Sequence, residues 1–407
     1  MDDRDASKSI AHLSPEEKRA LLAQLLRKKV QANQGNQAHS TTQGTHNTYT
    51  EQQSLTAPVV RPDVQHWSPL SQGQRALWFL FRLAPQSTAY NLLYSAHVRI
   101  QLDIPALQRS VQALVRRYPI LTATYTTRDG EPVHLFHEDA TVPVEVIDAS
   151  HWDEEYLRAQ LYTEGNQPFD LERGPVLRLK LFQRGGNDNI LALTIHHIAA
   201  DLWSLDLLID ELLALYAREQ TGLHVALPTP GIPFTEYVRW QNEMLTNAEG
   251  ERHWHYWQQE LSGEPAILHL PTDRPRPSLQ TYRGDSHSFF IDDNLVQRLK
   301  TLASSEKVTL YTLLLAAYTV LMFRYTEQED MLIGTPTLGR SRADMERVIG
   351  YLANPVVVRT NLADNPTFTG LLEQVRQKML HALEHQDYPF PLLVEKLQPK
   401  RDPGYSP

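Results

Sequence analysis

The sequence ILALTIHHIAADLWSLDLLIDELLAL, residues Ile190–Leu215, decides the fold because a strand pattern passes into a helix pattern within it. Its first six residues are an unbroken run of apolar and β-branched residues, which is typical of a strand buried on both faces. From Leu202 onward, leucine and isoleucine recur at spacings of three and four, whereas Asp206, Asp210 and Glu211 fall on the other side. That spacing predicts an amphipathic helix, so the stretch is typical of an α/β fold.

Four polar side chains lie between the two patterns, namely His196, His197, Asp201 and Ser204. Loops that follow buried strands often carry the chemistry of α/β proteins. Because successive strand side chains point to opposite faces, we expect one histidine to serve the site and the other to pack or support it. The same geometry argues against a metal site, whose ligands must converge on one point. A neutral imidazole suits proton transfer near neutral pH, and Asp201 could fix its tautomer or hold the loop.

The segment HHIAADLWS, residues 196–204, resembles the HHxxxDG(W)S signature of the condensation domains of nonribosomal peptide synthetases. As HxxxD, the signature is shared with a wider superfamily of CoA- and thioester-dependent acyltransferases. Other segments resemble further family motifs in the family's order, so the resemblance covers about residues 67–407. These segments are SPLSQGQRALWFL (68–80), FTEYVRW (234–240), IGYLANPVVVR (349–359), HQDYPF (385–390) and the beginning of a last motif at 401–403.

The resemblance implies an α/β fold of two chloramphenicol-acetyltransferase-like lobes, paired in a V with a tunnel between them. We expect a short amphipathic helix within residues 1–31, which could dock on another protein, and a disordered linker at 32–66. The N-terminal lobe should span 67–262, an inter-lobe linker 263–281, and the C-terminal lobe 282–407. That last lobe is expected to be truncated, because the chain ends within a family motif.

Periodicity predicts the individual elements of both lobes. Strands are expected at residues 94–100, 121–125, 133–136, 175–182, 189–195, 286–291 and 331–335, with a turn at Asp129-Gly130. Helices are expected at residues 104–118, 156–164, 247–261, 294–305, 309–325 and 368–385, and from 68 and 234 onward.

By motif, the resemblance implies that His197 is the catalytic residue, with His196 and Asp201 as active-site support. His197 either acts as general base toward the amine or positions it and steadies the tetrahedral intermediate. Leu202, Ser204 and Asn354 are expected to line the substrate tunnel. For Ser204 and Asn354, the alternatives are a helix cap and a turn residue.

Three departures from the family pattern bear on the site. Leu202 replaces the usual glycine, which could narrow or reshape the tunnel. Thr122 stands where an arginine normally pairs with the motif aspartate, so Asp201 should have another partner. Pro355 follows Asn354 and removes a backbone donor.

The implied activity is amide-bond formation between a donor acyl thioester and an acceptor aminoacyl thioester. Both are carried on the phosphopantetheine of partner carrier proteins, and the domain itself is expected to bind no cofactor and no metal. Further expected partners are an upstream synthetase subunit, through the N-terminal helix, and a downstream adenylation domain in the full-length chain. The alternatives are a domain that also dehydrates the incorporated residue, a non-catalytic module that recruits carrier proteins or tailoring enzymes, and a stand-alone CoA acyltransferase.

Composition excludes several other classes of protein. The net charge of −9 without a dominant basic patch argues against nucleic-acid binding. The absence of cysteine excludes disulfides, thiolate zinc sites and a cysteine nucleophile. The apolar window at residues 310–323 is shorter than the ~20 residues that span a bilayer, and is interrupted by Tyr and Thr, so we expect a buried core helix. A charged N-terminus without an apolar segment favours a cytoplasmic location and no membrane.

Overall fold

The computed structural model describes residues 67–399 except 138, 223–226, 264–266, 278, 279, 281 and 283. The predicted N-terminal helix, the linker at 32–66 and the motif at 401–403 therefore lie outside the described residues. Part of the predicted inter-lobe linker, within 263–281, also lies outside them. The contacts among residues 67–399 place them in one compact unit.

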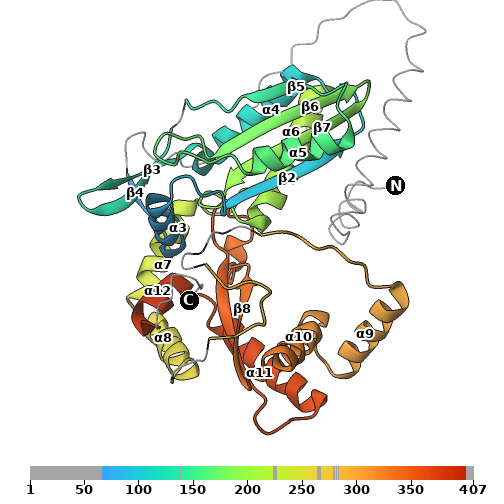
Figure 1. Ribbon diagram of the computed structural model, residues 1–407. Coiled ribbons are helices and arrows are strands. Elements are labelled where there is room, and N and C mark those ends of the chain that lie inside the picture. The colour runs from blue at the N-terminus through green and yellow to red at the C-terminus, as the bar shows by residue number, and fades with distance from the viewer. Residues whose placement is uncertain are drawn as a thin grey trace, which may run out of the picture. The chain divides into compact units, whose positions relative to one another are not determined.

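The first lobe is built on a four-stranded sheet in the order β2-β7-β6-β5 (Figure 1). β7 is antiparallel to both of its neighbours, and β5 runs parallel to β6. The strands are β2 (Asn91–Val98), β5 (Val144–Asp148), β6 (Leu177–Gly185) and β7 (Asp188–His196).

Helices cover both faces of this sheet. Leu193 and Ile195 of β7 pack into the core with α4 (Ile104–Arg117) and α6 (Leu202–Thr221). Ile190 and Ala192, which point the other way, pack with α5 (Glu154–Gly165). The prediction of a strand buried on both faces is therefore confirmed, and it explains the unbroken apolar run at 190–195.

Helix α6 follows the predicted stripe, with one exception. Asp201 caps it by accepting a hydrogen bond from Ser204 N at 2.8 Å, and its leucines at 205, 208, 212 and 215 are buried. The placement of Glu211 on the polar side is wrong, because this side chain is 1% exposed. Its carboxylate accepts hydrogen bonds from Arg117, Arg347 and Tyr118 at 2.8–2.9 Å, which offset the cost of burying the charge.

A small sheet in the order β1-β4-β3 lies beside α3 (Gln72–Leu83). The predicted hairpin with its turn at Asp129-Gly130 is confirmed, because β3 and β4 pair directly across it. The remaining elements of this part are β1 (Ser68–Pro69), η1 (Pro119–Thr122), β3 (Thr124–Arg128) and β4 (Glu131–Leu135).

The second lobe is described around the antiparallel pair β8 (Asp330–Thr337) and β9 (Asn354–Asn361). Its core joins Val358 of β9 to helices α9, α10 and α11. A further cluster joins Val356 of β9 to helices α8 and α12. The helices in these two clusters are α8 (Ala248–Glu260), α9 (Asp293–Ser305), α10 (Leu310–Thr326), α11 (Phe368–Glu384) and α12 (Phe390–Leu397), and η2 (Ala343–Met345) precedes β9. Helix α7 (Phe234–Leu245) instead packs with the core of the first lobe.

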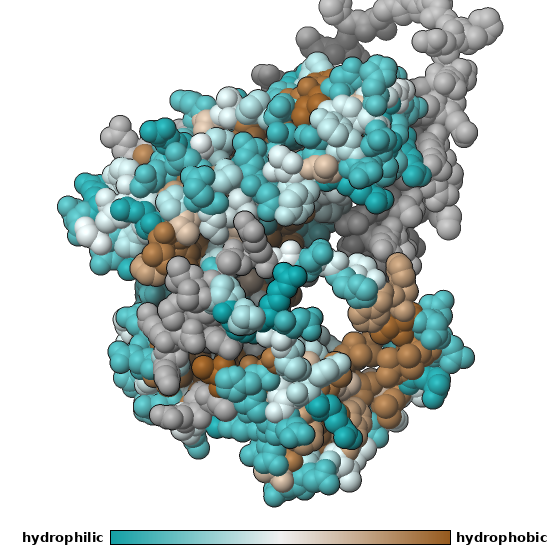
Figure 2. Space-filling view, viewed as in Figure 1, coloured by the Kyte–Doolittle hydropathy of each residue, from teal (hydrophilic) through white to brown (hydrophobic). Residues whose placement is uncertain are grey.

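Two predictions for this lobe are wrong. No strand forms at 286–291, where Phe290 is fully exposed, because no described strand pairs with this segment. Helix α10 is not buried all round, since one side exposes apolar and aromatic residues. Figure 2 shows hydrophobic side chains gathered over α9 and α10. Those of the exposed side of α10 are Tyr311, Leu314, Tyr318, Leu321 and Tyr325.

The sequence patterns predict neither the longer elements β5, β9 and α12 nor the short elements β1, η1 and η2. Within the described residues, no single helix is long and apolar enough to cross a membrane. Helices α9 and α10 reach the required length and composition only when taken together, and they are bent by 101° at their junction.

Candidate active site

His196 ends β7 and is a packing residue. Its backbone N donates to Val176 O at 3.0 Å, and its ring Nδ1 accepts from Ile198 N at 3.1 Å. The ring meets Phe169 edge-on at 6.1 Å and is 5% exposed. Burial, and then the neighbouring His197, lower the pKa of His196 to about 3. His196 is therefore neutral and supports the strand end, as the alternation of strand side chains predicts.

His197 has different surroundings. Its backbone N donates to Tyr90 O at 2.8 Å, and its half-buried ring meets the Tyr351 ring edge-on at 4.8 Å. Ring atom Nδ1 is buried and has no hydrogen-bond partner among the residues that the structure describes. Burial lowers the pKa of His197, and backbone groups of His197 and Ala200 together with the charge of Asp201 oppose this shift only in part. The imidazole is thus neutral at neutral pH and able to accept a proton.

Asp201 links the two lobes through an ion pair and hydrogen bonds. The carboxylate is 2% exposed and forms a two-point ion pair with Arg340, at 2.8 Å to Nη1 and 3.0 Å to Nη2. It also accepts hydrogen bonds from Leu352 N and Ala353 N at 3.1 Å each. The expectation that Asp201 has a partner other than residue 122 is confirmed, because Thr122 Oγ1 bonds to Pro119 O instead.

Ser204 completes the same connection. Its hydroxyl donates to Gly350 O at 2.9 Å and accepts from Gly350 N at 3.1 Å and from Arg340 Nη2 at 2.8 Å. Asp201 N donates to the same Gly350 O at 3.1 Å. We call these four residues, Asp201, Ser204, Arg340 and Gly350, the inter-lobe clasp. Ser204 is fully buried within it and also receives the helix cap from Asp201.

The other two residues predicted to line the tunnel, Leu202 and Asn354, are not members of the clasp. Leu202 is 67% exposed at the beginning of α6. Asn354 holds the turn at 386–390: Nδ2 donates to Gln386 O and Tyr388 O at 2.8 Å, and Oδ1 accepts from Phe390 N at 2.9 Å. The amide of Asn354 therefore organises the HQDYPF segment. The lining of a tunnel by Leu202, Ser204 and Asn354 stays a prediction.

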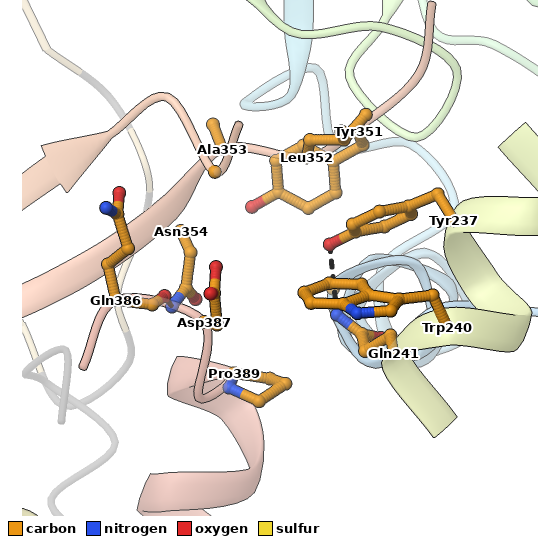
Figure 3. A pocket seen from close by; sticks show the side chains of 12 residues that line it. Tyr237, Trp240, Gln241, Tyr351, Leu352, Ala353, Asn354, Gln386, Asp387 and Pro389 are labelled. Carbon is orange, nitrogen blue, oxygen red and sulfur yellow. Dashed lines mark hydrogen bonds between the residues drawn. The ribbon is translucent and has the colours of Figure 1, made fainter. Parts of the chain in front are cut away.

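A pocket lies between helix α7 and the segment that begins at Tyr351. Tyr237 and Trp240 of α7 form one wall, and residues 351–354 face them across it (Figure 3). Tyr237 OH accepts from Gln241 Nε2 at 3.0 Å. Burial raises the pKa of the Asp387 carboxyl in this pocket, although a hydrogen bond from Ser341 opposes the shift. The remaining lining residues are Gly73, Gln241, Gly339, Gln386 and Pro389.

Sequence reasoning missed Arg340 and Tyr351. The replacement of the expected arginine by Thr122 indicates that Asp201 needs another cation, yet the second-lobe loop offers Arg340, Arg342 and Arg347 without distinguishing them. Nothing in the sequence identifies Tyr351, since it occupies a variable position of its motif. In the described part of the chain, no three His, Asp or Glu side chains gather as metal ligands would.

Comparison with known proteins agrees with this fold. The family model of the condensation domain matches residues 64–407, so the chain belongs to the condensation-domain family. It is 39% identical over 357 residues to one component of the linear gramicidin synthase of Brevibacillus parabrevis, covering 86% of this chain and 7% of that one. It is 38% identical over 343 residues to chondramide synthase cmdD of Chondromyces crocatus, covering 83% and 9%. The chain therefore spans less than a tenth of the length of these relatives.

Solved structures give the same assignment. The holo form of AB3403, a four-domain nonribosomal peptide synthetase, matches with a TM-score of 0.77 and 25% identity, over 86% of this chain and 26% of that one. The X-domain from teicoplanin biosynthesis matches with a TM-score of 0.77 and 28% identity, over 86% and 77%. The predicted α/β fold of two chloramphenicol-acetyltransferase-like lobes is confirmed.

Proposed function

We propose that this chain catalyses amide-bond formation in nonribosomal peptide biosynthesis. The acceptor is an aminoacyl thioester and the donor an acyl thioester, each on the phosphopantetheine of a carrier protein. The amine nitrogen bonds to the donor carbonyl carbon, the carbon–sulfur bond breaks, and the proton lost by the amine ends on the departing thiolate. The family assignment and the synthetases among the relatives support this activity.

One observation carries the choice of His197 as the catalytic residue. Asp201 and Ser204 are already bonded to Arg340 and to the 350–353 backbone, and His196 Nδ1 accepts from Ile198 N. Of these motif side chains, His197 is the one with a buried nitrogen that lacks a partner in the described structure. A neutral imidazole can take the amine proton or orient the amine for attack.

The partners follow from the same activity. Donor and acceptor carrier proteins bring the substrates, and the domain itself holds no cofactor. The proposal also includes a downstream adenylation domain in the full-length chain, docking of an upstream subunit through the N-terminal helix, and a cytoplasmic location. The multidomain synthetases among the relatives support the first of these.

The experiment uses the chain with separately loaded donor and acceptor carrier proteins, and mass spectrometry of the carrier-bound product. We expect a product of summed mass from the parent, and a rate at least ~100-fold lower from His197→Ala. His151→Ala is the matched control, because His151 is exposed. A product lighter by one water from a serine-loaded donor would favour the modifying alternative instead.

A second candidate is a module that recruits another enzyme without catalysis. The X-domain from teicoplanin biosynthesis supports it, because that domain was solved in complex with OxyB, with a TM-score of 0.75 to this chain and 28% identity. The two candidates differ in turnover. Binding of loaded carrier proteins without product from the parent would favour recruitment, whereas product formation excludes it.

A further inference from the structure

Tyr351 lies against the proposed catalytic histidine. Its ring centroid is 4.8 Å from that of His197, and the two ring planes meet at 66°. Edge-to-face packing of this kind is favourable beyond the area that it buries. His197 belongs to the first lobe, and Tyr351 belongs to the loop before β9. The contact joins residues that are 154 positions apart in the sequence (351 − 197).

The inter-lobe clasp fixes the backbone on both sides of Tyr351. Before it, Gly350 N and O bond to Ser204 Oγ. After it, Leu352 N and Ala353 N donate to Asp201 Oδ2. Because the peptide groups on both sides of Tyr351 are hydrogen-bonded to buried partners, the backbone holds the Tyr351 ring against the His197 imidazole.

The first lobe also leaves room for the ring. A Cβ atom at Gly73 of α3 would lie 2.9 Å from Tyr351 Cε1, which is closer than carbon atoms pack. Glycine favours a helix less than alanine does, so its presence at the second position of α3 needs a reason. Close approach of the Tyr351 ring supplies that reason.

The ring affects His197 by packing and by excluding water, not by charge. Burial raises the pKa of Tyr351 to about 12, with smaller effects of Tyr90 and Asp201, so the phenol is neutral. The titratable residues next to His197 are His196, which precedes it at the end of β7, Asp201 at the beginning of α6, Tyr90, whose backbone O accepts from His197 N, and Tyr351. Arg340 neutralises Asp201, which leaves desolvation as the largest influence on the imidazole.

We propose that Tyr351 is a positioning residue that orients the His197 imidazole and shields it from water, and that the inter-lobe clasp holds the Tyr351 ring in place. This assignment deepens the proposed function, because it concerns the same site. It also gives the motif aspartate a role here that involves no substrate contact. Asp201 holds the segment that carries Tyr351.

The test combines a titration that needs no turnover with a kinetic assay. His197 is titrated by NMR in histidine-labelled full chain, and its signal is identified by its loss in His197→Ala. In Tyr351→Phe, which keeps the ring, we expect the low pKa of the parent. In Tyr351→Ala we expect the pKa to move toward the ordinary histidine value of about 6.5. Tyr156→Ala, at an exposed tyrosine, should change nothing.

In the kinetic assay with loaded carrier proteins, Tyr351→Phe should keep kcat within about 2-fold, and Tyr351→Ala should lose 10-fold or more in kcat with a smaller change in KM. If Tyr351→Ala does not fold, Tyr351→Leu keeps apolar volume without the ring and takes its place. An unchanged His197 pKa in a folded ring-less variant overturns the inference. A parent without turnover would overturn the proposed function alone, because the titration still decides the inference.

Discussion

Arg340 and Asp201 form a two-point ion pair with side chains only 2% exposed each, across a sequence separation of 139 residues. The pair couples the N-terminus of α6 in the first lobe to the loop that precedes β9 in the second. An uncompensated charge at such depth is costly, so the pair makes the two lobes interdependent at the site. Substitutions at Arg340 and at Ser204 test this clasp.

Removing the arginine should destabilise the whole domain. We expect Arg340→Ala to lower the free energy of unfolding by about 3–5 kcal/mol, because Asp201 would stay buried without its partner. Arg340→Lys should recover only part of the loss, since an ammonium cannot make both contacts. Urea denaturation measures both, with Arg158→Ala at an exposed ion pair as the control. Equal stabilities of Arg340→Ala and the control would contradict the role of the clasp.

The hydroxyl of Ser204 should contribute less than the ion pair but still measurably. Ser204→Ala leaves Gly350 N without its buried partner and removes one hydrogen bond each from Arg340 Nη2 and from Gly350 O, which keeps Asp201 N, and this should cost about 1–3 kcal/mol. Ser304→Ala, at an exposed position in α9, is the matched control. Both variants are measured by the same urea denaturation. Equal free energies of unfolding for Ser204→Ala and Ser304→Ala would contradict the role of the clasp.

Acid should destabilise the domain through buried histidines, and His134 allows a clean measurement. It is fully buried in β4, neither ring nitrogen has a partner in the described part of the chain, and burial lowers its pKa to about 4. The unfolded chain, with an ordinary pKa near 6.5, binds the proton more strongly, so stability is lost as the pH falls from about 6.5 toward 4.

The variant His134→Phe removes this titration while filling a space bordered by Tyr125 and Phe136. We expect it to reduce the stability difference between pH 7 and pH 4 by an amount on the order of 3 kcal/mol. Urea denaturation at the two pH values, for parent, His134→Phe and His151→Ala, makes the comparison. A parent and a His134→Phe variant with the same pH dependence would refute the assignment.

The exposed apolar side of α10 should drive self-association. Tyr311, Leu314, Tyr318, Leu321 and Tyr325 recur at spacings of three and four, and each is 42–61% exposed. Such stripes favour contact with other apolar surfaces. We expect Tyr318→Lys with Leu321→Lys to lower the average mass in analytical ultracentrifugation without altering the His197 titration. A parent that sediments as a monomer at all concentrations would disprove this.

The sequence predicted the elements that rest on local pattern. The apolar run at 190–195 predicted β7, because a strand buried on both faces has apolar residues at successive positions. The leucine spacing after Leu202 predicted α6, because a helix buried along one stripe repeats its apolar residues every three or four positions. The Asp129-Gly130 hairpin is equally local. By contrast, the segment 286–291 has a strand-like composition but no described strand beside it, and a strand needs a partner for its backbone groups.

The candidate site divides in the same way. Strand alternation alone predicts different surroundings for His196 and His197, and the sequence at Thr122 predicts that Asp201 has another partner. The identity of that partner could not, since Arg340 reaches Asp201 only when the two lobes meet. Glu211 was misplaced for the same reason: two of its partners, Arg117 and Arg347, come from distant segments that periodicity within α6 does not report.

The central claim, that His197 makes the amide bond possible, is tested most directly by single-turnover quenched flow. Parent, His197→Ala and His151→Ala are mixed with loaded donor and acceptor carrier proteins, and the carrier-bound amide is quantified against time. We predict equal rate constants for the parent and His151→Ala, and a value at least ~100-fold lower for His197→Ala. Amide formation at the parental rate in a folded His197→Ala chain would contradict the account.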